Sequence, residues 1–176
     1  DYVFQNCTSL RMVEIPEGVT SIGVCAFNNC PSIIELNLPS TLETIKSTAF
    51  SNCKSVTSLL LPNNLKRIET NAFSSMIGLT EVVVPDSVTY LGSAVFQYCY
   101  NLRELSIPFV GPQREINRSS SSTASSSNYT IGYLFGTSSF TNSYSVIGYY
   151  ATYTGIKGDD NYYHFGAGAS MPTSSS

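Results

Sequence analysis

The chain has 176 residues and a formal net charge of −3. Its nine Lys and Arg residues are scattered, which leaves no basic patch for a phosphate backbone, so we expect no nucleic-acid partner. No apolar run approaches the ~20 residues that a bilayer-spanning helix needs, so we also expect no membrane insertion of these residues.

A repeat of 23 residues organises the first 111 residues. Its most regular column is Phe4, Phe27, Phe50, Phe73 and Phe96. The third position after each Phe is Cys7, Cys30, Cys53, Met76 and Cys99. A fixed period of this length is the sequence signature of stacked repeats. The opening stretch DYVFQNC enters the pattern part-way, and we therefore expect a piece of a longer protein.

Two apolar positions, separated by one variable position, predict a strand in each repeat. The pairs are Val13 with Ile15, Leu36 with Leu38, Leu59 with Leu61, Val82 with Val84, and Leu105 with Ile107. A proline follows every pair, at Pro16, Pro39, Pro62, Pro85 and Pro108. Proline lacks the N–H that a sheet needs and fixes φ, so it marks the point where the chain leaves the strand.

The remainder of each repeat, from Val19 to Ala26 in the first, carries further apolar columns. We expect short extended or 3₁₀ turns there, because few residues remain for a full helix. A single coil cannot bury its apolar side chains, whereas stacked coils place like residues over one another. The sequence therefore predicts a β-rich solenoid of about five coils over residues 1–111, with one parallel strand in each coil.

The combined phenylalanine, cysteine, apolar and proline columns of residues 2–111 resemble the BspA-like class of bacterial surface leucine-rich repeats. The resemblance implies a right-handed leucine-rich repeat solenoid in secreted or surface-exposed proteins that bind host or matrix proteins. It also implies a β-rich tail after the repeats. One departure is Met76 in the cysteine column, a soft apolar replacement that argues against a required thiol.

The five cysteines raise the question of disulfides, metal or packing. An odd number, the lack of a C-x-x-C pair and a single histidine argue against a disulfide framework and a zinc site. We interpret the column as core packing, because a buried free cysteine behaves as a small hydrophobe. Cys25 lies outside the column and is the one thiol that we consider for reactivity.

The template stops after residue 111. We expect residues 112–128, which contain RSSSSTASSS, to form a flexible loop because they lack the apolar surface to offset ordering. Residues 129–176 are rich in Tyr and Gly and predict a β-type C-terminal cap, with strands within 129–140 and 144–156. We expect Tyr133, Phe135 and Tyr150 to contact the last coil. The final MPTSSS resembles the start of a further strand, so the cap is predicted to be truncated.

Few residues suggest chemistry. His164 is the only imidazole, and although it could serve a nucleophile as a base, we interpret it as incidental; we expect no catalytic residues and no cofactor. Glu35, Glu81 and Glu104 share one outward position that could attract calcium, but a solvated face is favoured and we expect no metal site. Glycosylation sequons begin at residues 6, 117 and 128, and we expect the first to be buried.

The remaining candidate is a surface. The predicted outward positions of the strands are Met12, Glu14, Glu35, Asn37, Ser58, Leu60, Glu81, Val83, Glu104 and Ser106. Leu60 and Val83 are apolar where polar residues are expected, and solenoid faces commonly bind proteins. We therefore expect a non-catalytic interaction module of a secreted or cell-surface protein, adhering to host or matrix proteins. The alternative is a structural spacer without a ligand of its own, and the oligomeric state stays open.

Overall fold

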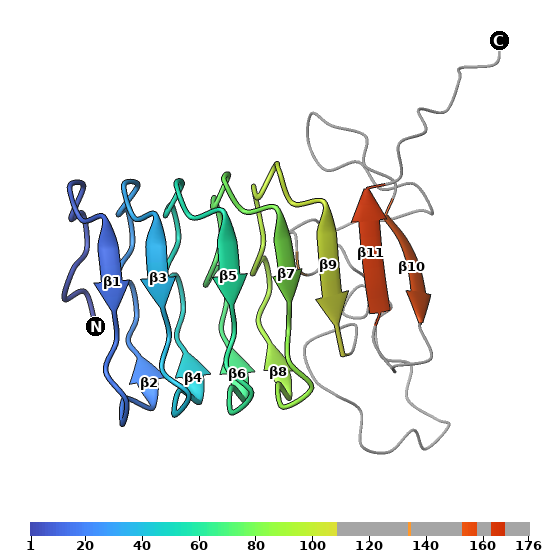
Figure 1. The fold of residues 1–176 in the computed structure, drawn as a ribbon, viewed down its shortest axis with the longest axis horizontal. Helices are drawn as coiled ribbons and strands as arrows, with labels where there is room; N and C mark the ends of the chain where they lie inside the picture. The colour runs from blue at the N-terminus through green and yellow to red at the C-terminus, as the bar shows by residue number, and fades with distance from the viewer. Residues whose placement is uncertain (109–133, 135–152, 158–162, 168–176) are drawn as a thin grey trace, which may run out of the picture.

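The structure is a computed structural model that describes residues 1–108, 134, 153–157 and 163–167. Residues 1–108 form a solenoid in which the strands of successive coils lie side by side (Figure 1). No α-helix occurs within these 108 residues. The predicted leucine-rich repeat solenoid of parallel strands is confirmed.

The longer strands of the coils line one side of the solenoid. They are β1 (Met12–Glu14), β3 (Glu35–Asn37), β5 (Ser58–Leu60), β7 (Glu81–Val83) and β9 (Glu104–Ile107). Pairing is parallel and offset by one repeat, as in Leu59 with Val82 and Val82 with Leu105. The apolar column alternates with outward residues, as the sequence pattern predicts.

A second set of strands lines the return side of each coil. It consists of β2 (Ser21–Ile22), β4 (Thr44–Ile45), β6 (Arg67–Ile68) and β8 (Tyr90–Leu91), paired in parallel. The expectation of one strand per coil was therefore wrong, although the expected extended return is confirmed. Two residues suffice for a strand here because the side chain of the second residue points into the core and the backbone pairs with the equivalent residues of the adjacent coils.

Stacked phenylalanine rings run along the core. The centroids of Phe4 and Phe27 lie 5.1 Å apart, and those of Phe27 and Phe50 lie 5.3 Å apart. The column continues to Phe73 and Phe96 at 6.0 Å and 5.9 Å, with planes tilted by 15° or less throughout. Such separations are typical of favourable offset stacking. The 23-residue spacing of the phenylalanines thus corresponds to a continuous stack of aromatic rings in the core.

Two columns of residues with left-handed backbone bracket this stack. The first contains Tyr2, Cys25, Thr48, Asn71 and Ala94, and the second contains Asn6, Asn29, Asn52, Ser75 and Tyr98. Between the columns, alternate N–H groups donate to the next coil, as from Phe27 to Ala49 at 2.8 Å. We did not predict these columns. The asparagines of the second column are a usable signal, since Asn tolerates left-handed backbone better than most residues.

The described strands of the tail pair with the last coil of the solenoid. Strands β10 (Tyr153–Lys157) and β11 (Tyr163–Ala167) form an antiparallel hairpin, and β11 pairs antiparallel with β9 (Figure 1). Leu134 is fully buried and its carbonyl accepts a hydrogen bond from the Phe96 N–H at 2.9 Å. In register, Leu134 therefore follows Ala26, Ala49, Ala72 and Val95.

Several expectations for the tail lie outside the described residues. These are the flexible loop at 112–128, the contacts of Tyr133, Phe135 and Tyr150, the sequons at 117 and 128, and the final segment 171–176. The predicted strand within 129–140 also lies outside, apart from Leu134. The strand expected within 144–156 overlaps β10, which begins at Tyr153 and ends at Lys157. The domain boundaries remain predictions.

Candidate functional site

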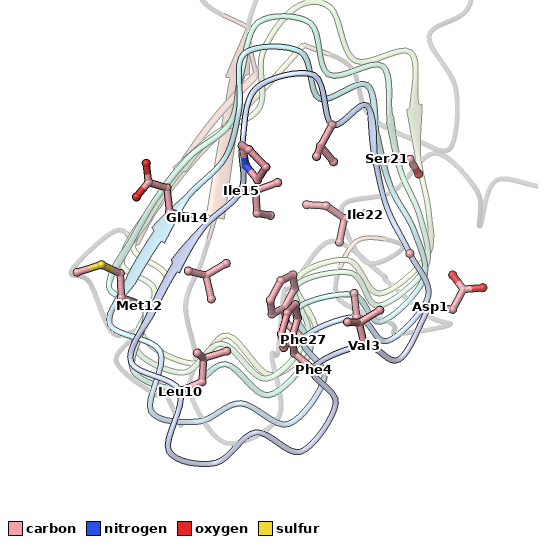
Figure 2. A pocket seen from close by; sticks show the side chains of 15 residues that line it. Asp1, Val3, Phe4, Leu10, Met12, Glu14, Ile15, Ser21, Ile22 and Phe27 are labelled. Carbon is pink, nitrogen blue, oxygen red and sulfur yellow. The ribbon is translucent and has the colours of Figure 1, made fainter.

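The outward positions of the strand side form a face that is open to solvent. Of the ten predicted residues, all are exposed except Ser106, which is half-buried. Figure 2 shows the geometry in the first coil, where Met12 and Glu14 point away from the core and Leu10 and Ile15 point into it. We call this surface the strand face, and it contains Met12, Glu14, Glu35, Asn37, Ser58, Leu60, Glu81, Val83, Glu104 and Ser106.

The strand face carries negative charge. Its only ionisable side chains are the carboxylates of Glu14, Glu35, Glu81 and Glu104. Glu35 accepts a hydrogen bond from the Asn37 amide at 3.1 Å. Glu81 and Glu104 occupy partner positions on the adjacent strands β7 and β9. Like charges on neighbouring strands are destabilising, so this arrangement is not explained by stability.

Two cations of the described solenoid form ion pairs away from the strand face. In the described part of the chain, the ion pairs are Lys66 with Glu43 at 2.8 Å and Arg67 with Glu69 at 3.1 Å, both next to β6 on the return side. The Arg67 guanidinium also lies 3.7 Å from the centroid of the Tyr90 ring. The strand-face carboxylates therefore stand without an ion-pair partner among the described residues.

Apolar side chains lie exposed in the middle of the strand face. Leu60 is 87% exposed and Val83 is 49% exposed, and the two are partners on β5 and β7. Ile34, directly before β3, is 56% exposed. The predicted apolar pair is thus present on the surface as adjacent side chains.

The sheet is interrupted beside this apolar patch. Strands β1 and β3 form one sheet, and β5, β7 and β9 belong to another, so the parallel pairing is not continued between β3 and β5. The return sheet is continuous at the same level, because Thr44 pairs with Arg67. Leu36 is half-buried there, although its counterparts in the other coils are buried. At the interruption Leu36 thus packs against the core but is less completely covered than its counterparts.

The structure places His164 at the sheet rather than at an isolated site in the tail. His164 belongs to β11, in register with Ser106 of β9 on one side and Ile156 of β10 on the other. The hairpin thus extends the strand-face sheet beyond the last coil. Sequence reasoning missed this placement because the tail has no repeat from which to read a register.

The cysteine column is part of the core. Cys30, Cys53 and Cys99 are buried, and Met76 is fully buried in the same column. The thiols of Cys53 and Cys99 donate to the carbonyls of Phe27 and Phe73, at 3.3 Å and 3.2 Å. Burial raises the pKa of each of these two thiols to about 12, and it also raises the pKa of Cys30. The burial of these side chains confirms the packing interpretation. The raised pKa values keep the thiols protonated and poorly nucleophilic.

Asn6 differs from the sequence expectation in its environment, whereas Cys25 lies outside the cysteine column as expected. Cys25 is a half-buried free thiol with φ of 53°, in the first left-handed column. Asn6 was expected to be buried but is exposed, because a described coil covers it on one side only. Its side-chain oxygen accepts a hydrogen bond from the Asn29 amide at 2.8 Å. This hydrogen bond, rather than burial, restrains the Asn6 side chain.

No metal-binding or membrane-spanning feature is found in the described residues. Across residues 1–108 and the described tail segments, no group of three or more His, Cys, Asp or Glu residues could hold a metal ion. No helix there has the length and apolar character to cross a membrane.

A concavity of about 500 Å³ opens at the N-terminal end of the described solenoid (Figure 2). Its walls are the ends of the core columns, with Phe4, Ile22 and Phe27 inside and Asp1 at the rim. The lining consists mainly of the apolar residues that pack between successive coils, and its polar side chains are those of Asp1, Glu14 and Ser21. It presents no convergent polar groups of the kind that orient a small ligand.

Comparison with known proteins agrees with the stacked geometry. The BspA type leucine rich repeat region matches residues 1–120 in six copies. The chain belongs to this family. Its match begins at the first coil and extends past β9, so the family region includes the whole strand face of the solenoid.

Solved structures of similar proteins extend the comparison. The leucine-rich repeat protein TpLRR of T. pallidum is 31% identical with a TM-score of 0.56, and the match covers 59% of each chain. A leucine-rich repeat protein of Bacteroides ovatus is 34% identical with a TM-score of 0.57, covering 61% of this chain and 28% of that one. The pneumococcal vaccine antigen PcpA is 27% identical with a TM-score of 0.54, covering 59% and 26%. The chain thus spans only part of each relative's length, and no curated protein matches it.

Proposed function

We propose that this chain is a non-catalytic protein-interaction module of a bacterial secreted or cell-surface protein, which adheres to host or matrix proteins through the strand face. The observation that carries the proposal is the exposed apolar pair of Leu60 and Val83 on a regular sheet. Extended solenoid faces of this kind are common protein-binding surfaces. Membership of the BspA type repeat family and likeness to a vaccine antigen support the surface location.

The proposal is tested by placing charges on the strand face. The double variant Leu60→Arg with Val83→Glu should lose binding in surface plasmon resonance against a panel of purified matrix and serum proteins. Its thermal unfolding should stay close to that of the parent, because both side chains are exposed. A matched variant, Ser21→Glu with Thr44→Arg, places the same charges on the return sheet and should bind as the parent does.

The outcomes separate an interaction module from a spacer. Binding that survives the strand-face variant would remove this face from consideration. A parent chain that shows no saturable binding to any protein of the panel would favour a structural spacer without its own ligand. Binding lost equally in both variants would point to a general effect of charge and would also contradict the proposal.

A further inference from the structure

The strand face has two outward columns with different chemistry. The column at the first position of the strands contains Glu35, Glu81 and Glu104, together with Met12 and Ser58. The column at the third position contains Leu60 and Val83 on β5 and β7, and Glu14, Asn37 and Ser106 on the other strands. The columns are two residues apart along the strands, or about 6.6 Å. A partner that lies along the solenoid axis would therefore contact carboxylates on one side and aliphatic side chains on the other.

Charge complementarity favours a cationic partner. The three carboxylates are exposed and form no ion pair with another described residue. Glu81 and Glu104 also repel one another across β7 and β9. The position before each strand in the second to fourth coils is Ile34, Thr57 and Thr80, so basic side chains flank the column only at the outer coils. Lysine or arginine from a partner would relieve this repulsion.

The apolar part of the face is wider than two side chains. Ile34 and the half-buried Leu36 lie at the interruption between β3 and β5, next to the strand that carries Leu60. Aliphatic groups of a partner can contact this region as well as Val83. Burial of such surface contributes to affinity, and the carboxylate column sets the orientation of the bound segment.

The spacing of outward residues on adjacent strands favours one conformation of the partner segment. Adjacent strands lie about 4.8 Å apart, so equivalent outward residues repeat at this distance along the solenoid. A helix repeats with a pitch of about 5.4 Å, and its i, i+4 side chains are about 5–6 Å apart. An extended peptide presents one face only every ~6.7 Å. The helical spacing is the closer match over the three coils from β5 to β9.

We infer that the strand face binds a cationic amphipathic helix of a partner protein. Its Lys or Arg residues lie over Glu35, Glu81 and Glu104, and its aliphatic residues lie over Leu60 and Val83. The inference rests on the proposed function, because it names the chemistry of the partner segment at the same face.

A synthetic helical peptide tests the inference directly. The probe carries Lys along one stripe and Leu along the adjacent stripe, with a fluorescent label, and binding is followed by anisotropy at about 0.15 M salt. The parent chain should bind it saturably. Glu81→Gln with Glu104→Gln should weaken binding by about tenfold, since each exposed charge contributes modestly. A matched variant with the same net charge, Glu17→Gln with Glu43→Gln, should bind as the parent does.

Two further peptides supply the outcomes that would overturn the inference. A peptide with Glu in place of Lys, or Ser in place of Leu, should bind much more weakly. Equal binding of either peptide, or equal loss in the matched variant, would show that the paired stripes are not recognised. If matrix proteins bind through Leu60 and Val83 while the Lys–Leu peptide does not bind, the proposed function stands and the helical partner is refuted. If neither binds, both are refuted.

Discussion

Removal of one ring from the middle of the aromatic stack should destabilise the whole solenoid. Phe50 is fully buried, and its ring centroid lies 5.3 Å from that of Phe27 and 6.0 Å from that of Phe73. Truncation of a buried phenylalanine typically costs about 3–5 kcal/mol in the free energy of unfolding. Two stacking contacts, each of about 0.5–1.5 kcal/mol, are lost within this total. We therefore expect Phe50→Ala to fall at the upper end of the range.

Phe4 offers a matched control in the same column. It is 44% exposed and stacks on Phe27 alone, so Phe4→Ala should cost only about 1–2 kcal/mol. Urea unfolding followed by circular dichroism of residues 1–176 measures both values. Phe50→Leu should recover part of the loss, because it restores apolar volume without the ring. Equal costs for Phe4→Ala and Phe50→Ala, or a cost below about 1 kcal/mol for Phe50→Ala, would refute a cooperative stack.

Three further predictions concern the cysteines and the left-handed backbone. Because the pKa of Cys53 and of Cys99 is raised from 9.0 to about 12, the folded state holds two protons that the unfolded state releases. The contribution of these two thiols to the free energy of unfolding should be complete below pH 9 and should decrease as the pH rises from 9 towards 12. The decrease should be shallower in Cys53→Ala. An unchanged slope would contradict the burial of that thiol. Ellman's reagent should label at most Cys7 and Cys25 in the folded chain and all five thiols in urea, and rapid labelling of a third thiol would contradict the packing. Thr48→Asn should stabilise the chain by about 0.5–1 kcal/mol in urea unfolding, because a β-branched residue at φ of 60° is strained, and a loss of stability would argue against that strain.

The sequence predicted the solenoid well because its information is repeated. Each buried position recurs in every coil, so one substitution such as Met76 does not obscure the column. The alternation around Leu59 and Val82 likewise fixes which residues face the core and which face solvent. The residues of the strand face, apart from the half-buried Ser106, were therefore identified correctly as exposed, while their role in binding is still a proposal.

Features that distinguish one coil from another could not be predicted in the same way. The interruption between β3 and β5 exposes Leu36, although its sequence position is indistinguishable from that of Leu59. The pairing of two parallel strands depends on the local twist and on packing beneath them, and neither is encoded by an apolar column. Column analysis treats the coils as identical, so it identified the exposed Leu60 and Val83 but not the partly accessible Leu36 of the coil that differs.

The tail shows the same limit and one missed signal. The docking of β11 on β9 depends on a contact between segments more than 50 residues apart, and no repeat marks its register. Leu134 nevertheless precedes a phenylalanine, as Ala26, Ala49 and Ala72 do. The Phe96 hydrogen bond confirms that Leu134 occupies the equivalent place. A search for the Ala-Phe step with a relaxed first residue would have found it.

The positions that break the repeat are the ones on which the proposed function depends. Apolar residues recur at the core positions of every coil, and substitution there stays apolar, as from Cys to Met76 or from Ala to Val95. The strand face instead accumulates differences, including adjacent Glu81 and Glu104 and the exposed Leu60. Each of these lowers stability or solubility when the chain is alone. The proposed partner would account for their coexistence on one face, because it would neutralise the carboxylates and cover the aliphatic side chains in a single contact.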